Sequence, residues 1–140
     1  MNSDNNYNYK LITEDLITKL IKDTESNEFK WNRICLHKNS NSKIHSMVMC
    51  MKNGVESGFH FHEKSQEIIT YAFIGYPFRI KIMENINTKK VKTFLIDSHN
   101  PIVSLRDCIC RSVVNNSNKT ITYLEHRSGP YLKEKIIWVN

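Results

Sequence analysis

The sequence lacks any long run of apolar residues. No stretch approaches the roughly 18 unbroken apolar residues that span a membrane, so we expect no membrane partner. The first ten residues, MNSDNNYNYK, are polar and lack the apolar segment of a secretory signal peptide. We therefore expect residues 1–10 to form a flexible arm and the protein to work in the cytoplasm.

The sequence lacks the cysteine spacings that are typical of a zinc-binding site. The chain has four cysteines, of which Cys108 and Cys110 form a C-x-C pair. That spacing differs from a zinc knuckle, and no second pair completes a site of four thiolates. Because nothing marks the chain as secreted, we expect the thiols to be reduced.

The basic residues form no continuous stripe. The net charge is +6, yet only Lys89, Lys90 and Lys92 lie close together. A surface that binds nucleic acid usually combines clustered basic residues with interleaved aromatics. We therefore expect no nucleic-acid partner, and the positive balance favours a small anionic or sugar ligand.

What the chain does contain is enough for one domain. It has 140 residues, 40% apolar and 24% charged, as is typical of a globular domain with its own core. No internal repeat or linker divides residues 11–140. Apolar residues at spacings of three to five predict a helix over Leu11–Lys22, with Thr13 as its cap and 23–27 as a polar exit.

Short β-rich segments separated by turns make up the rest of the chain. The alternation is cleanest in Phe78–Met83, and Lys52-Asn53-Gly54 and Gly75-Tyr76-Pro77 mark turns. Many short strands with regular turns are typical of an all-β barrel or sandwich. The other predicted strands are Ile44–Met51, Phe59–His62, Glu67–Ile74, Val91–Ile96, Ile102–Leu105, Ile109–Asn115, Thr120–Glu125 and Ile136–Val139.

The stretch GFHFHEKSQE, residues 58–67, carries the candidate chemistry. Side chains alternate along a strand, so His60 and His62 point to one side and the two phenylalanines to the other. If the next strand pairs antiparallel, Glu67 returns beside the two rings. Two imidazoles and a carboxylate can bind a transition metal, or form an acid–base pair with an orienting carboxylate. The residues alone leave both possibilities open.

The spacing around these residues resembles the first motif of the cupin family, G-x5-H-x-H-x3–4-E-x6-G. Gly54, His60, His62 and Glu67 match it, and Gly75 follows one residue later than the motif requires. The resemblance implies an all-β fold, the cupin double-stranded β-helix (a jelly-roll barrel), with the site inside the barrel.

From about Leu11 onward the chain is similar to the small WbuC-type cupins of bacterial polysaccharide gene clusters. The shared features are a short N-terminal helix, the segment RICLH at 33–37, the methionine-rich strand HSMVMCM and the segment EHRSGPY at 125–131. The resemblance implies that Arg33, His37, Glu125 and Tyr131 bind substrate. It also implies a pathway, the synthesis of surface polysaccharide (O-antigen or capsule). From the fold class we expect a homodimer.

The second cupin motif departs from the family pattern. Arg111 stands where the family usually has a metal-binding histidine, in the string RDCICRSV at 106–113. Arginine cannot ligate a metal and repels a dication. One possibility is that His60, His62 and Glu67 hold a divalent ion (iron, manganese, zinc or nickel) with fewer ligands. The other is that Arg111 pairs with Glu67 or Glu125 and takes the place of the metal.

Three functions fit these observations. The first is isomerisation or epimerisation of a sugar or nucleotide-sugar, with His60 or His62 as the base and with Glu67 and Arg111 beside them. The second is metal-dependent chemistry at the two histidines and the glutamate. The third is a non-catalytic binding module, which the degraded second motif favours.

Overall fold

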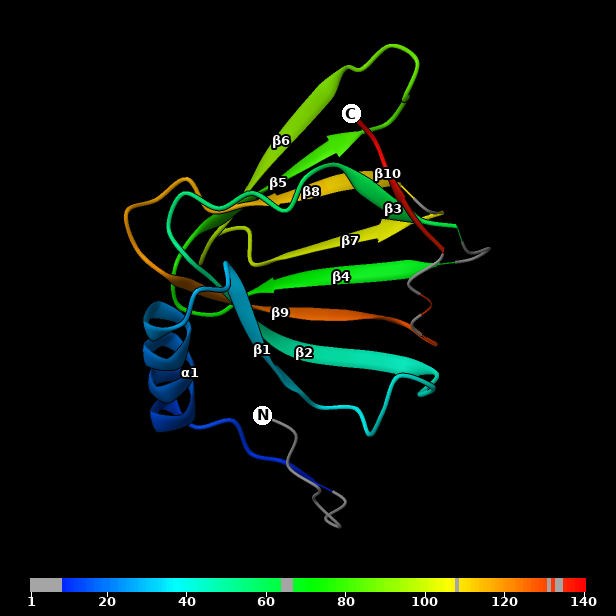
Figure 1. Cartoon of the computed structure of the whole chain (residues 1–140). Coiled ribbons are helices and arrows are strands. Elements are labelled where there is room, and N and C mark those ends of the chain that lie inside the picture. Colours follow the sequence, from blue (N-terminus) through cyan, green and yellow to red (C-terminus); the bar gives the residue numbers. More distant parts are fainter. Residues whose placement is uncertain (1–8, 64–66, 108, 131, 133–134) are drawn as a thin grey trace.

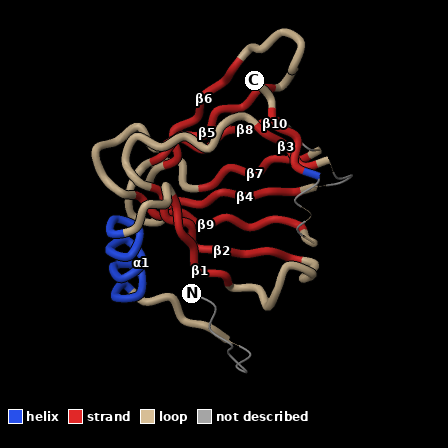
Figure 2. Tube along the Cα trace, viewed as in Figure 1, coloured by secondary structure: helices blue, strands red, loops and turns tan. Residues whose placement is uncertain are grey.

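The computed structural model describes residues 9–63, 67–107, 109–130, 132 and 135–140, so Cys108 and the candidate residue Tyr131 lie outside the described residues. Within this part of the chain, one helix precedes ten strands (Figures 1 and 2). The elements are α1 (Glu14–Ser26), β1 (Trp31–Cys35), β2 (Ile44–Met51), β3 (His60–His62), β4 (Ile68–Phe73), β5 (Phe78–Met83), β6 (Val91–Ile96), β7 (Ile102–Arg106), β8 (Cys110–Val114), β9 (Ile121–Ser128) and β10 (Ile136–Trp138).

The strands form two antiparallel sheets, and the all-β prediction is confirmed. One sheet has the order β1-β2-β9-β4-β7 and the other has the order β10-β3-β8-β5-β6. Strands distant in sequence are neighbours: β2 pairs with β9 from Ile44 opposite Ser128 to Met51 opposite Ile121. In the second sheet, β3 meets β8 where His60 lies opposite Arg111. The crossing connections bring residues 60, 111 and 125 into one interior.

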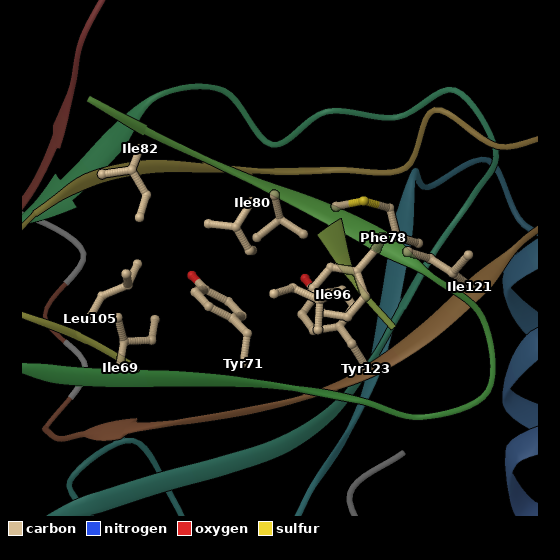
Figure 3. Packing of buried hydrophobic residues seen from close by; sticks show 11 residues of the cluster. Ile69, Tyr71, Phe78, Ile80, Ile82, Ile96, Leu105, Ile121 and Tyr123 are labelled. Atoms are coloured by element: carbon tan, nitrogen blue, oxygen red, sulfur yellow. The ribbon is translucent and has the colours of Figure 1, made fainter. Parts of the chain in front are cut away.

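Apolar side chains from both sheets pack together in this interior (Figure 3). Tyr71 and Ile69 of β4 lie in one cluster with Ile80 and Ile82 of β5. Tyr123 of β9 stacks on Phe78, with ring centroids 4.9 Å apart. Each fully buried side chain of this kind contributes roughly 1.5–3 kcal/mol. The core therefore holds the sheets face to face, and inward residues of either sheet can meet.

Helix α1 covers the outer face of the first sheet (Figure 1). Its residue Leu20 is fully buried in a second cluster with Ile34 of β1 and with Val48 and Cys50 of β2. Alternation explains this arrangement, because residues 48 and 50 point outward while residues 47, 49 and 51 point inward. The helix thus stabilises the sheet without entering the barrel.

The predicted bounds of the helix were wrong at both ends. The helix begins at Glu14 because Thr13 is its N-cap, and the Thr13 hydroxyl accepts a hydrogen bond from the Leu16 amide at 3.2 Å. Leu11 is exposed and lies outside the helix. The helix continues to Ser26 because Thr24 is buried and donates its hydroxyl to the Leu20 carbonyl at 2.7 Å. The predicted polar exit is therefore the last turn of the helix.

The predicted strands agree with the structure within about two residues, except at the end of β9. The sequence pattern ended that strand at Glu125, whereas β9 continues to Ser128. It continues because Arg127 pairs on both sides, with His45 of β2 and Ile69 of β4. Arg127 therefore falls on the same inward face as Glu125. The strand β1 had no predicted bounds.

Two simpler expectations can be compared with the structure. No helix in the described ranges has the length and apolar character needed to cross a membrane. Cys35, Cys50 and Cys110 carry free thiols, in agreement with the expected reduced state.

Candidate functional site

His60 and His62 lie side by side on β3 and point into the space between the sheets. Their ring centroids are 5.8 Å apart, and both rings line a cavity of about 190 Å³. The predicted alternation of this short strand is therefore present. The inward residues of the other sheet, from β4 and β9, form the opposite wall.

His60 is held in one tautomer. Its Nδ1 lies 2.9 Å from the carbonyl oxygen of Gly58. Because a carbonyl can only accept a hydrogen bond, Nδ1 carries the proton and the neutral ring has its lone pair at Nε2. Burial, followed by the charge of Arg111, lowers the pKa of His60 to about 4, and the bond to Gly58 only partly opposes this shift. At neutral pH the ring is uncharged and presents an acceptor.

Glu67 lies beside the His62 ring and is 2% exposed. Its Oε1 lies 3.2 Å from His62 Nδ1 and 3.5 Å from Arg111 Nη2. Burial alone would raise the pKa of Glu67, but the His62 ring and the guanidinium groups of Arg111 and Arg127 outweigh burial and hold the pKa below its usual value. Glu67 is therefore an anion that orients His62 and balances a buried cation.

Arg111 is the most deeply buried charged residue near the site, with 1% of its side chain exposed. It forms the ion pair with Glu67 that the sequence allowed, and its Nε donates to the Tyr71 hydroxyl at 3.3 Å. Arg111 is not among the residues that line the cavity. Burial would lower the pKa of Arg111, but Tyr71 and the carboxylates of Glu67 and Glu125 raise it, so the residue stays charged.

This buried layer has unused hydrogen-bonding capacity. Oε2 of Glu67 and Nη1 of Arg111 make no hydrogen bond to the described residues, and Oε1 of Glu67 has only its contacts with His62 and Arg111. Buried polar atoms without partners are uncommon and costly, and they are usually satisfied by water or a ligand. The layer beneath the cavity is therefore prepared for additional polar contacts.

Arg127 is the cation that lines the cavity, and sequence reasoning missed it. Its Nη1 lies 3.3 Å from Nδ1 and 3.2 Å from Nε2 of His62. A group in the ring plane at these distances would meet the Cε1 hydrogen, so the guanidinium lies against the face of the ring. The signal was available, because a residue two positions after the inward Glu125 shares its face if the strand continues.

Glu125 also lines the cavity, where the sequence analysis placed it, and His126 is exposed on the other face. Tyr71 completes the polar wall. Burial raises the pKa of Tyr71 to about 12, so it remains a neutral phenol. Trp31 and Trp138 line the same cavity from β1 and β10. The cavity is thus lined by one carboxylate, one guanidinium, two imidazoles and two phenols, with tryptophans beside them.

Two other candidates do not line this cavity. Arg33 is exposed on β1, and its Nη1 contacts the Met47 sulfur at 3.8 Å. His37 stacks on His45, with ring centroids 4.0 Å apart, and its Nδ1 lies 3.1 Å from the Ser46 carbonyl oxygen. Arg33 lies on β1, the edge strand of the first sheet, and His37 follows that strand.

The predicted metal site does not match this geometry. Among the residues that the structure describes, no three His, Cys, Asp or Glu side chains are grouped as metal ligands. Glu67 pairs with Arg111 and is not among the residues that line the cavity. Two guanidinium groups beside these donors would repel a dication. The residues present therefore do not fit a divalent ion held by His60, His62 and Glu67.

Comparison with known proteins identifies the fold. No protein-family model and no curated protein sequence matches the chain. Among solved structures, the capsular polysaccharide assembling protein CapF from Staphylococcus aureus aligns with a TM-score of 0.60 and 9% identity, over 81% of this chain and 33% of that one. Oxalate oxidase in complex with the substrate analogue glycolate gives a TM-score of 0.60 and 11% identity, over 81% and 57%.

Oxalate decarboxylase OxdC from Bacillus subtilis gives a TM-score of 0.53 and 14% identity, over 69% of this chain and 24% of that one. This chain spans less than two thirds of the length of each of these three structures. At such identities the likeness shows the fold alone. Together with the two sheets and the inward H-x-H strand, it shows that the chain is a cupin in fold, a jelly-roll barrel, as the motif predicted.

Proposed function

We propose that this cupin is an enzyme that binds a sugar ring in the barrel and moves a proton on it, by isomerisation or epimerisation. The observation that carries the proposal is His60, which lines the cavity and is neutral, with the proton at Nδ1 and the lone pair at Nε2. A base of this kind can take a proton from a carbon next to a carbonyl. In the same cavity Glu125 can accept hydrogen bonds from sugar hydroxyls, and Arg127 can donate to the carbonyl oxygen.

The size of the cavity suits a monosaccharide. A volume of about 190 Å³ corresponds to roughly six water molecules in the liquid, which is near the volume of one sugar ring. In this proposal Arg111 does not touch the ligand. It holds Glu67, which orients His62, and its charge keeps His60 unprotonated. Arg127, which lines the cavity, is the guanidinium that contacts the ligand.

The pathway is part of the same proposal. The WbuC-type motifs point to surface-polysaccharide synthesis, and one of the structural neighbours is a capsular polysaccharide assembling protein. We place the protein in the cytoplasm, as a homodimer, on the grounds given by the sequence.

A deuterium-exchange assay tests the reaction. The protein is incubated in D₂O with keto-hexoses supplied free, as 1-phosphates and linked to nucleotides, and NMR follows the protons next to the carbonyl. We expect exchange with the native protein and none with His60→Gln, while His99→Gln, which changes an exposed histidine, exchanges normally. If the protein binds these sugars but exchanges deuterium into none of them, the proposal is contradicted.

A non-catalytic binding module is the second candidate. The pKa of about 4 at His60 favours it, because a base works best when its pKa lies near the working pH. An anionic ligand beside Arg127 would offset part of the positive charge that lowers this pKa. The two candidates therefore differ in whether ligand binding raises the pKa of His60, which NMR can measure in the same samples.

A further inference from the structure

Both tryptophans of the chain lie at the cavity. The sequence contains two, Trp31 and Trp138, and both line the cavity described above. Trp31 belongs to β1 and Trp138 to β10, which are edge strands of opposite sheets. Trp31 is 45% exposed and Trp138 is 59% exposed, whereas Tyr71 and Arg127 on the same cavity are buried. The indoles therefore form its outer rim, and the polar groups lie deeper.

Trp138 is held firmly in this position. Its ring lies 4.9 Å from the His60 ring, centroid to centroid. It also packs against the backbone of Gly58, where a Cβ atom would lie 3.6 Å from the indole. Gly58 has a φ of +86°, a conformation that glycine adopts readily. The segment that carries the histidines thus supports the Trp138 indole. This contact fixes the position of the indole relative to the proposed base, His60.

A rim of exposed indoles favours ligands that carry a flat aromatic group. Large aromatic side chains exposed together at a concave site usually mark a binding surface. Aromatic rings stack with flat π-systems, and every nucleobase has such a face. Inside the cavity there is room for about one sugar ring, so any larger part of a ligand must lie across the rim. Exposed Arg33, two residues along the same face of β1 from Trp31, supplies a positive charge there.

We infer that the rim formed by Trp31 and Trp138 binds the base of a nucleotide, so that the substrate is a nucleotide-linked sugar. The sugar ring enters the cavity, the base stacks on the indoles, and the phosphates lie between them near the arginines. This inference rests on the proposed function for the sugar ring. It adds a separate subsite, built from residues that take no part in the proton transfer.

Intrinsic fluorescence tests the subsite directly, because the chain has no tryptophan elsewhere. We would titrate the native protein with UMP, dTMP, UDP-glucose and glucose 1-phosphate. Trp31→Phe and Trp138→Phe leave one indole each as the reporter, and Trp138→Leu removes stacking at that position. We expect saturable quenching by the nucleotides. We expect Trp138→Leu to bind UDP-glucose at least about tenfold more weakly, equivalent to about 1.4 kcal/mol of stacking.

The outcomes separate this inference from the proposed function. Equal affinity for glucose 1-phosphate and UDP-glucose, or no quenching by any nucleotide, overturns the nucleotide subsite. If the native protein still exchanges deuterium on a free keto-hexose, the proton-transfer function stands without the subsite. A loss of affinity in Trp138→Leu that is larger for UDP-glucose than for glucose 1-phosphate, with normal far-UV circular dichroism, supports the inference.

Discussion

The buried pair of Glu67 and Arg111 gives the sharpest prediction about stability. With side-chain exposures of 2% and 1%, and 3.5 Å between Oε1 and Nη2, the two charges are shielded from water. At an effective dielectric constant of about 20, two unit charges at this distance attract by about 5 kcal/mol. Removing one partner of a buried pair typically costs 3–5 kcal/mol, because the other charge stays buried without compensation.

A double-mutant cycle measures this coupling. We expect Glu67→Gln and Arg111→Met each to lower the free energy of unfolding by about 3–5 kcal/mol. The double variant leaves neither charge buried alone. Its loss of unfolding free energy should therefore be smaller than the sum of the two single losses, by about 2 kcal/mol or more. Urea unfolding at pH 7, with an unchanged dependence on denaturant, gives these values.

The control is the exposed ion pair of Lys92 and Glu84, whose side chains are 64% and 59% exposed. Glu84→Gln should change the stability by less than about 1 kcal/mol. If the losses at Glu67 and Arg111 add within about 0.5 kcal/mol, the two groups are not coupled. The account of Arg111 as the partner that holds Glu67 would then be wrong.

Three further predictions concern pH and local packing. The folded pKa of His60, about 4, lies below its ordinary 6.5, so between these values the unfolded chain binds a proton that the folded chain does not. The free energy of unfolding should therefore fall as the pH drops from 6.5 to 4, by up to roughly 3 kcal/mol. Unfolding measured at a series of pH values should show a weaker pH dependence for His60→Gln than for the native protein. Thr13→Ala should cost about 1 kcal/mol in urea unfolding through loss of the bond to the Leu16 amide, and Thr18→Ala in the same helix serves as control. Gly129→Ala should cost about 1–3 kcal/mol or more, because the new Cβ would lie 1.9 Å from the Ser42 carbonyl oxygen; a melting temperature equal to that of the native protein contradicts this.

The fold and the centre of the site could be predicted from local patterns. Alternation on a strand suffices to put His60 and His62 on one face, and a motif with fixed spacing carries the fold. These features depend on short-range geometry, which the sequence expresses directly. Glu67 reaches His62 but not by the predicted antiparallel pairing, because β3 pairs with β8 and β10 whereas β4 belongs to the other sheet.

The rest of the site depends on which strands become neighbours. Arg127 was missed because the sequence pattern ended its strand at Glu125, and only pairing with both β2 and β4 extends it. Arg111 was expected at the cavity, but it is buried against Tyr71, from a strand of the other sheet, and does not line the cavity. Trp31 and Trp138 meet at one cavity although more than a hundred residues separate them. Contacts of this kind leave no local trace in the sequence.

The protonation state of His60 is the most direct test of the central claim, that a neutral imidazole presents its lone pair to a ligand inside the barrel. Nitrogen and proton NMR of the ring, assigned with His60→Gln, follows it from pH 7.5 to 3.5. The account predicts a neutral ring protonated at Nδ1 at pH 7, with a pKa of about 4. A ring protonated at Nε2, or one with a pKa near 6.5, would contradict it.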